Sequence, residues 1–397
     1  MDFNNFIRTN RIGDYSTLKN YLELDPYNLK FKEDINYPNL LLIYNTEKSD
    51  FNLKIVNECN GLIIDKDKLN IVCYTFDKCN NSEIIPDNLD KDNLFIECAA
   101  EGTLIRLYYN YGKWIFSTKK CIDASKAKWL SSKNFIDLFF DCIGEYDIFQ
   151  KLDINCCYSF LIIHPENNIV IQNIIPFLYH INTRNMTTLE ELVNDYIGVN
   201  RLDRIRIQKE ELDNEIYSLI NNPYLAHEGL IFIDQNFNRW KIQSNIYKRA
   251  KLLWGNTNNR FYRYLELRKD ITLLNEYLKY FPNDKDKFIN YEVHINDFGN
   301  ILLEKYILRH IKKDINLIPY YFSKLIYKLH GNYLKDKIQT NHDKIMLFLL
   351  ELEPKKLLFV LNSYNKDKNN INNVNTENNT EQYNENNTEY DTQMDVE

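Results

Sequence analysis

The sequence of residues 95–104 is Phe-Ile-Glu-Cys-Ala-Ala-Glu-Gly-Thr-Leu, and its last residues begin a predicted β-hairpin. Segments 103–109 and 114–118 are rich in β-branched and aromatic residues, with turn-forming residues between them. Residues 124–142 and 188–221 have apolar spacing closer to that of helices. Strand pairs interleaved with helices predict an α+β domain of antiparallel sheets. Three further hairpins show the same pattern, with strands at 61–65 and 69–74, at 158–163 and 169–171, and at 229–233 and 240–243.

The chain changes character beyond residue 247, where apolar residues take helical spacing and Lys and Arg occupy the outer faces. The predicted helical segments are 247–251, 260–281, 301–312, 320–329 and 344–362. The last residues are rich in Asn, Thr and Glu, so they bury too little apolar surface to offset the entropy lost on ordering. We therefore predict an α+β domain over 1–254, an all-helical C-terminal domain over 255–364, and a disordered tail over 365–397.

Composition limits the function. The chain has 397 residues and a formal net charge of −7, which argues against a protein that coats nucleic acid by bulk charge. Its first residues show neither the basic segment nor the apolar segment that a signal peptide would have. No apolar run approaches the roughly 20 residues of a membrane-spanning helix. We expect an intracellular, cytoplasmic protein with no membrane partner. The high content of Asn, Ile, Lys and Tyr resembles that of AT-rich genomes, such as those of large DNA viruses.

Four segments share a common character with one known family, and they are, in chain order, 57–65, 98–104 with 116–120, 158–170, and 228–231 with 241–247. In this order they resemble the nucleotidyltransferase core of the T4 RNA ligase 1-like family. Their counterparts in the family have the patterns E-C-R-G, then K-x-D-G-S with a basic strand end, then F-E-F-x-x-x-P-x-N-R-I-V, and finally E-G with K-x-K-S-x-x-Y. The resemblance implies an RNA ligase-like fold. It also implies enzymes that use ATP to adenylate their own lysine, pass AMP to a 5′-phosphate RNA end and seal the strand.

The same resemblance implies which residues would form a site. ATP and Mg²⁺ are the implied cofactors, and Glu228 is the implied metal ligand. The family lysine is a nucleophile, which requires an amine with a lowered pKa. Ala99 occupies that position and has no atom able to attack a phosphate. The implied cofactor-binding residues are Glu228, Lys241, Glu101, Gly102 and Lys119.

Other charged positions of the family are also replaced. Each lost charge-assisted hydrogen bond would cost about 1.5–3 kcal/mol of ligand binding. Because glycines and apolar strand residues are kept while charges are lost, we expect that the fold was retained and catalysis was not. The replaced positions are Asn60 and Asn168 for arginines, Ser159 and Leu161 for glutamates, and Gln243 for the second lysine.

Three hypotheses follow. The first is a ligase-like protein without self-adenylation that acts as an RNA- or protein-binding factor. The alternative is a divergent but active ATP-dependent RNA ligase, in which Lys119 or Lys120 supplies the amine or preadenylated RNA is sealed without it. A third is a purely structural protein, in which the retained glycines serve strand geometry and the lysines are ordinary surface residues. Convergence of Ala99, Glu228 and Lys241 on an open cleft would favour descent from a nucleotidyltransferase, and a filled cleft would favour the structural hypothesis.

Overall fold

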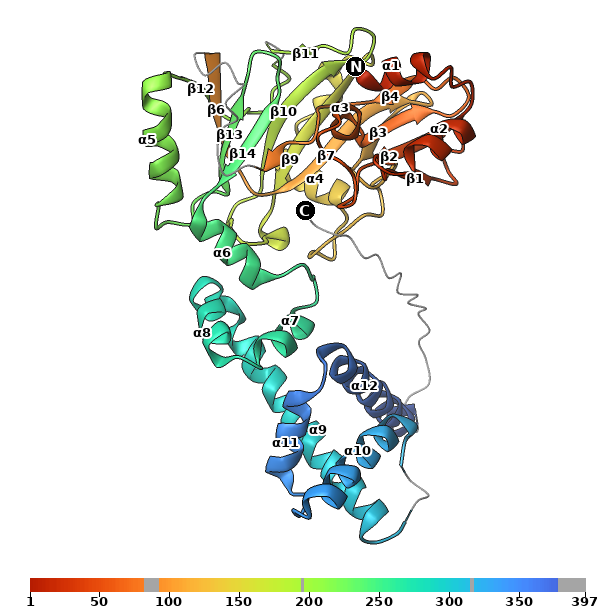
Figure 1. The fold of residues 1–397 in the computed structure, drawn as a ribbon, viewed down its shortest axis with the longest axis vertical. Coiled ribbons are helices and arrows are strands. Elements are labelled where there is room, and N and C mark those ends of the chain that lie inside the picture. Colours follow the sequence, from red (N-terminus) through yellow and green to blue (C-terminus); the bar gives the residue numbers. More distant parts are fainter. Residues whose placement is uncertain (82–92, 194–195, 315–317, 378–397) are drawn as a thin grey trace. The chain divides into compact units, whose positions relative to one another are not determined.

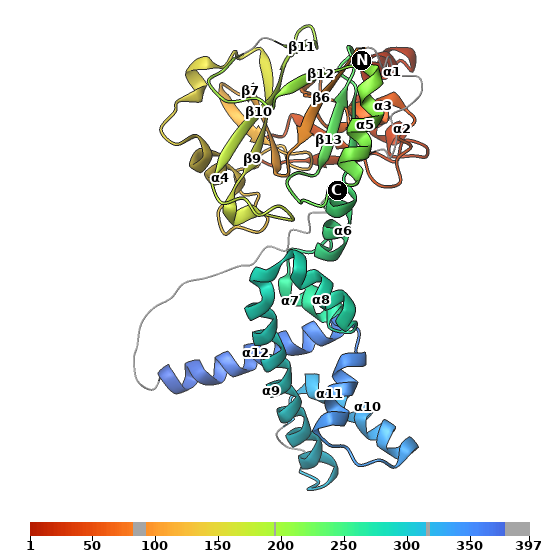
Figure 2. The same ribbon diagram turned by 90° about the vertical axis from the view of Figure 1, so that its left-hand side faces the viewer.

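The computed structural model describes residues 1–81, 93–193, 196–314 and 318–377. The chain divides into two compact units, Met1–Lys251 and Leu252–Glu397. The first unit is built on three sheets with helices against them, and the second is helical throughout its described part (Figures 1 and 2). The predicted fold class is therefore confirmed. Among the described residues, no helix has the length and apolar content needed to cross a bilayer.

The first sheet has the order β1-β2-β3-β4, and all its pairs are antiparallel. Its second strand, Leu-Leu-Leu-Ile-Tyr, is almost wholly buried because helices cover one face and the second sheet covers the other. The strands are β1 (Lys30–Glu33), β2 (Leu40–Tyr44), β3 (Asn60–Asp65) and β4 (Ile71–Cys73), and the helices are α1 (Asp2–Thr9), α2 (Tyr15–Leu22) and α3 (Lys54–Glu58).

The second sheet has the order β11-β10-β9-β7-β8. One face packs on α4 (Phe135–Ile143), where the ring of Phe139 lies edge-on to Phe116 and Phe160. The other face packs on the first sheet, and Tyr108 is fully buried between the two. Core packing therefore explains Tyr108. The strands are β7 (Thr103–Asn110), β8 (Lys113–Ser117), β9 (Cys156–Ile163), β10 (Phe177–Asn185) and β11 (Glu191–Leu192).

The third sheet has the order β12-β6-β13-β14-β5 and is antiparallel except for its β14–β5 pair. Helix α5 (Lys209–Ile220) covers one face, with Leu212 and Leu219 in a cluster with Phe232 and Ile242 (Figure 1). The opposite face carries most of the predicted site. The strands are β5 (Asn80–Asn81), β6 (Leu94–Ala99), β12 (Arg204–Ile207), β13 (Gly229–Ile233) and β14 (Arg239–Gln243).

Three of the four predicted hairpins are confirmed, as β3–β4, β7–β8 and β13–β14. The hairpin with a second strand at 169–171 is wrong, because β9 pairs with β7 and β10 instead. Residues 169–171 do not form a strand because the Glu101 carboxylate accepts hydrogen bonds from the backbone N–H groups of Val170 and Ile171. Those two groups are thereby unavailable to a strand ladder.

The two helices predicted between hairpins are largely wrong. Within 124–142, only the residues of α4 are helical. Within 188–221, the chain forms β11 and β12 before α5 begins. Residues Arg204–Ile207 become a strand because β6 offers an open edge, and the Arg204 side chain pairs there with Glu97.

Helix α6 (Asn245–Trp254) follows β14, and the second unit continues with six more helices. The predicted segment 260–281 is broken by Asp270, whose side chain caps α8 by accepting two backbone N–H groups. The predicted segment 344–362 is broken at Pro354, which begins α12. In the core of the unit, the rings of Phe298 and Phe322 stack with centroids 5.3 Å apart. The helices are α7 (Arg260–Leu267), α8 (Ile271–Tyr280), α9 (Lys285–His310), α10 (Tyr320–Asp336), α11 (His342–Glu351) and α12 (Pro354–Glu377).

Helix α12 extends into the segment 365–397 that the sequence predicted to be a disordered tail. It includes residues 365–377, while residues 378–397 lie outside the described part of the chain. The first turns of α12 bury Leu357, Val360 and Leu361, and once a helix is nucleated each further residue adds one backbone hydrogen bond. The division between the units falls after Lys251, three residues before the predicted boundary.

Candidate functional site

The predicted site lies on the face of the third sheet that α5 does not cover. Ala99 ends β6 and is opposite Gly229, which is in turn opposite Gln243. Lys241 is opposite Ile231, two residues further along β13. Directly opposed residues, and residues two apart, share a sheet face. Ala99, Lys241 and Gln243 therefore point to the same side.

Glu228 joins this group from the residue before β13. Its backbone N–H donates to the Ala99 carbonyl oxygen at 2.9 Å, so the two chain segments are in register. Its carboxylate accepts from Lys241 Nζ at 2.7 Å and from Gln243 Nε2 at 3.4 Å. Burial alone would lower the pKa of Lys241, but the adjacent Glu228 carboxylate outweighs it and the pKa is raised. Lys241 thus remains a cation at neutral pH.

Glu101 is an internal anchor. Its carboxylate accepts from the backbone N–H groups of Val170 and Ile171 at 2.8 and 2.7 Å, and from the hydroxyl of Tyr247 at 2.6 Å. The side chain is buried, and this burial raises the carboxyl pKa even though the three donors and Lys251 act to lower it. Both oxygens are used within the protein, so Glu101 does not present a free carboxylate to a ligand.

Tyr247 is the residue that sequence reasoning passed over. It was part of the matched pattern, three residues after Ser244, but received no role. Its ring is fully buried at the start of α6, and its hydroxyl links that helix to Glu101. Burial, together with the charges of Glu228 and Glu101, raises the pKa of Tyr247, so it stays protonated and donates.

Chain segment 74–76 contacts both the second and the third sheet. The Thr75 carbonyl oxygen accepts from Asn182 Nδ2 at 2.9 Å and from Arg184 Nε on β10. On the other side, the Arg239 guanidinium of β14 lies 4.9 Å from the ring centroid of Phe76. Arg239 alternates with Lys241 along β14 and so shares its face. The face that carries Ala99 is therefore covered at the Arg239 end.

The remaining charges of this face are also paired. Arg239 donates to Glu191 Oε1 at 2.6 Å, and Arg204 lies 2.7 Å from Glu97 Oε1. Glu97 is opposite Ile231, hence on the Ala99 side of the sheet. Both pairs are formed by residues far apart in sequence, and no local pattern could have identified them.

Lys119 is placed on different elements. It follows β8, and its Cα lies against Gly61 of β3, where an added Cβ would come within 2.8 Å. Gly61 has φ of +87°, and its carbonyl oxygen accepts from the buried Arg106 guanidinium. Gly61 and Lys119 thus meet at the contact of the first two sheets, whereas Ala99 belongs to the third.

Gly102 and Gly229 are required by close packing. A Cβ on Gly102 would lie 2.5 Å from the Ile162 carbonyl oxygen of β9, and one on Gly229 would overlap the Ile242 carbonyl oxygen of β14. For these two glycines, strand geometry is sufficient explanation.

No described side chain of this group fits the role of the missing nucleophile. Lys241 is protonated and paired. Burial raises the pKa of the Cys79 thiol to about 11 despite nearby Lys241 and Arg239, and burial also raises the pKa of Cys98. Both are therefore thiols rather than thiolates at neutral pH, and the thiol is the unreactive form.

The residues also do not fit a resident metal. Among the described residues, no three His, Cys, Asp or Glu side chains are grouped to hold an ion. Glu228 is a single carboxylate with Lys241 already bound to it. The arrangement is consistent with a charged cluster that stabilises the junction of β6, β13 and β14.

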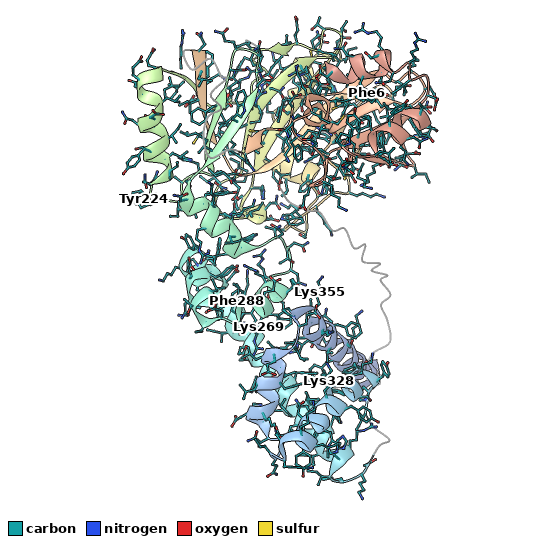
Figure 3. The ribbon with its side chains drawn as sticks, viewed as in Figure 1. Phe6, Tyr224, Lys269, Phe288, Lys328 and Lys355 are labelled. Atoms are coloured by element: carbon teal, nitrogen blue, oxygen red, sulfur yellow. The ribbon has the colours of Figure 1, made fainter. Side chains whose placement is uncertain are left out.

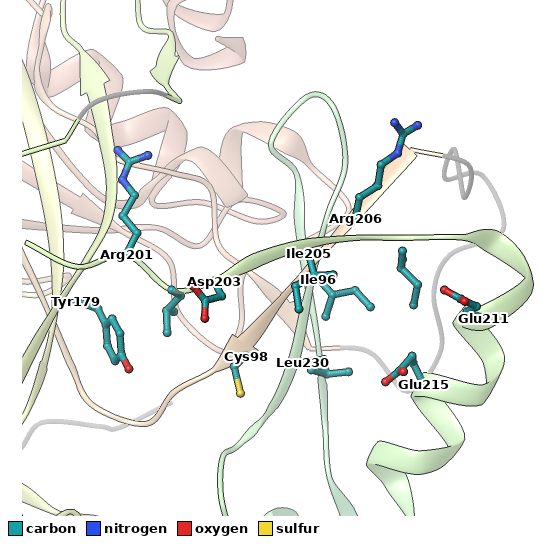
Figure 4. A pocket seen from close by; sticks show the side chains of 12 residues that line it. Ile96, Cys98, Tyr179, Arg201, Asp203, Ile205, Arg206, Glu211, Glu215 and Leu230 are labelled. Carbon is teal, nitrogen blue, oxygen red and sulfur yellow. The ribbon is translucent and has the colours of Figure 1, made fainter.

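A cavity of about 480 Å³ lies on the other face of the third sheet (Figure 4). Ile96 and Cys98 of β6 and Leu230 of β13 form its floor, and α5 contributes Glu211 and Glu215. Because residues alternate between faces, these floor residues point away from Ala99 and Lys241. The cavity therefore does not include the predicted site.

Comparison with known proteins gives related viral sequences and no family. No protein-family model matches the chain. It is 24% identical over 283 residues to the immediate-early protein ICP-46 homolog of Invertebrate iridescent virus 3, covering 66% of this chain and 61% of that protein. The homolog of Invertebrate iridescent virus 6 is 24% identical over 250 residues, which are 55% and 54% of the two chains. The match thus spans little more than half the length of these relatives.

Among solved structures, the chain is similar to ATP-dependent RNA and DNA ligases. An archaeal ATP-dependent RNA ligase gives a TM-score of 0.44 at 14% identity, covering 84% of this chain and 83% of that one. A putative ATP-dependent DNA ligase from Aquifex aeolicus gives 0.42 at 11% identity, with coverages of 81% and 79%. Naegleria gruberi RNA ligase with PPi gives 0.32 at 14% identity, with coverages of 44% and 57%. These similarities identify neither an activity nor a catalytic residue in this chain.

Proposed function

We propose that this chain is a ligase-like protein that does not adenylate itself and acts as a binding factor for RNA or protein. The Lys241–Glu228 pair carries the proposal. Lys241 is an amine on the same sheet face as Ala99, and its partner keeps it protonated. A protonated amine has no lone pair for attack on a phosphate. The resemblance to the T4 RNA ligase 1-like family supports the ancestry of the site.

The internal use of Glu101 supports the same proposal. A cofactor-binding carboxylate needs a free oxygen, and both oxygens of Glu101 are occupied by Val170, Ile171 and Tyr247. Segment 74–76 covers part of the face on which nucleotide would lie, as judged from its contacts with β10 and Arg239. ATP and Mg²⁺ are therefore not part of the proposed function.

The test is incubation of the purified full chain with α-labelled ATP and Mg²⁺ or Mn²⁺, followed by denaturing electrophoresis. An active RNA ligase serves as positive control, and circular dichroism shows that the protein is folded. We expect no label on the polypeptide. Label that persists through denaturation and disappears on substitution of one lysine would establish the active-ligase alternative instead.

We further propose a role inside a virus-infected cell. Both sequence relatives are named immediate-early proteins of iridescent viruses, which supports a viral origin for this chain. The composition typical of AT-rich genomes agrees with this origin. Transcript measurement early in infection, with protein synthesis blocked, tests the timing; a transcript that requires earlier viral protein synthesis would contradict it.

A further inference from the structure

Helix α10 has two sharply different sides. Phe322, Leu325, Ile326 and Leu329 are buried in the second unit. The opposite side carries Tyr320, Lys324, Tyr327, Lys328 and Lys335, which we call the tyrosine-lysine face. Their spacing of three, four and seven residues keeps them on one side of a helix with 3.6 residues per turn. Figures 1 and 2 show α10 within the helical unit, and Figure 3 labels Lys328 there.

The two tyrosines of this face are unusually open. Tyr320 is 77% exposed and Tyr327 is 58% exposed. Along the helix axis they are about 10 Å apart, at 1.5 Å per residue. Each ring has a cation over one of its faces: Lys324 Nζ lies 5.6 Å from the Tyr320 centroid, and the Arg309 guanidinium of α9 lies 4.5 Å from that of Tyr327 and also donates to its hydroxyl. The other face of each ring is left for a stacked base.

The charge of the face is positive and uncompensated. Within the described part of the chain, Lys324, Lys328 and Lys335 take part in no ion pair. The one acid of α10, Asp336, is bound by Lys344 at 2.7 Å. Residues 252–377 contain 20 Lys and Arg against 15 Asp and Glu, and residues 378–397 add six Asp and Glu and no Lys or Arg. A partner for this face must therefore be negatively charged.

We propose that the tyrosine-lysine face binds single-stranded RNA. Unpaired bases offer open aromatic faces that stack on tyrosine, and their phosphates attract lysine. A paired duplex hides its base faces, and sequence-tolerant readers of single-stranded RNA combine the same two elements. An acidic peptide would satisfy the lysines but would leave the two open rings unused.

This inference rests on one part of the proposed function, namely that the chain acts by binding. It does not depend on the absence of self-adenylation, because the face lies in the second unit and Ala99 lies in the first. A positive label in the ATP experiment would overturn the proposed function and leave the tyrosine-lysine face unaffected. Absence of RNA binding would overturn the role of the tyrosine-lysine face and leave the proposed absence of self-adenylation unaffected.

The test measures fluorescence anisotropy of a labelled 12-nucleotide uridine oligomer titrated with the full chain at several salt concentrations. One variant combines Lys324→Gln with Lys328→Gln, and another combines Tyr320→Ala with Tyr327→Ala. The matched control combines Lys269→Gln with Lys355→Gln, two exposed lysines of the same unit without an ion pair in its described part (Figure 3). Circular dichroism compares the folding of all variants.

We expect the lysine variant to reduce the slope of log affinity against log salt by about 1.4, since each phosphate contact of a single strand contributes about 0.7. The tyrosine variant should bind at least about thirtyfold more weakly, since it loses two stacks and each is worth about fivefold or more. The control should bind as the unmodified chain does. Absence of binding, equal binding by the tyrosine variant, or equal affinity for duplex RNA would overturn the proposal. Equal affinity for the matching DNA oligomer would overturn the assignment to RNA.

Discussion

Glu101 holds three donors of the first unit through one buried carboxylate. The family pattern has an aspartate where this chain has Glu101. The longer side chain reaches Val170, Ile171 and Tyr247 at once. We predict that Glu101→Asp cannot keep all three hydrogen bonds and lowers the free energy of unfolding by about 1.5–3 kcal/mol. Urea unfolding followed by tryptophan fluorescence measures this loss.

The control for Glu101→Asp is Glu210→Asp, which shortens an exposed carboxylate in the first turn of α5. It should change stability by no more than about 0.5 kcal/mol. If both variants unfold at the same urea concentration, Glu101 is not the anchor that its contacts indicate.

His180 sets a pH dependence for the first unit. It is buried on β10, where Nε2 lies 2.9 Å from Thr183 Oγ1 and Nδ1 accepts from Arg201 Nε. Burial, and next the Arg201 charge, lower its pKa to about 3. Between this value and the unfolded pKa of about 6.5, the unfolded chain binds the extra proton. The contribution of neutral His180 to the free energy of unfolding is therefore fully present above pH 6.5. It falls by about 1.4 kcal/mol for each pH unit below 6.5.

The measurement compares the unmodified chain with His180→Gln by urea unfolding at pH 7.5, 6.0 and 5.0. The stability difference between them should shrink as the pH falls, because only the unmodified chain carries this titration. Raised carboxyl pKa values at Glu58 and Glu101 act in both proteins and cancel. A difference that stays constant with pH would show that His180 is not held neutral.

The residues of the candidate site were predictable only in part. Glu228 and Lys241 were identified from the resemblance of segments 228–231 and 241–247 to the family patterns, and the β13–β14 hairpin brings them together. The pairing of Glu97 with Arg204 joins residues 107 positions apart. No periodicity or motif records such a contact, since it depends on which strand takes the open edge of β6.

At the scale of elements, close packing between strands requires glycine at positions that the family resemblance had singled out. A Cβ on Gly229 would overlap the Ile242 carbonyl oxygen and lie 2.7 Å from Gln243 Cα. We predict that Gly229→Ala lowers the free energy of unfolding by about 1–3 kcal/mol, as overpacking does in other proteins. Gly13→Ala is the control, because nothing lies within 4 Å of an added Cβ there. Equal urea midpoints for the two variants would contradict the role assigned to Gly229.

Local elements were predictable and distant pairings were not. The β3–β4, β7–β8 and β13–β14 hairpins were found because each strand pairs with its neighbour in sequence across a short turn. The β9–β10 pair was missed, since a loop with a short 3-10 helix (Pro165–Asn167) separates its strands and Glu101 holds part of that loop. In the helical unit, single polar caps such as Asp270 divided segments that looked continuous from apolar spacing alone.

At the scale of the whole molecule, two units of different structural class follow from a change of apolar period near residue 250. The sequence also gave a reason to expect a ligase-like site that had lost its charge. What could not be predicted is that the Ala99 side of the third sheet is covered at its Arg239 end, because segment 74–76 reaches Arg239 and β10 only in the folded chain. The features that support our proposal of no self-adenylation thus lie on several elements rather than at one residue.

This distribution makes a prediction about restoring the nucleophile. Ala99→Lys returns an amine to the family position, yet Ala99 is only 2% exposed and the surrounding face is occupied by paired charges. A small misplacement of a reacting group is costly, and Gln243 leaves no added cation for the triphosphate on this face. We therefore expect Ala99→Lys to acquire no label from α-labelled ATP while remaining folded. If it is labelled, the loss of activity rests on a single side chain, and the surrounding cleft still accommodates nucleotide.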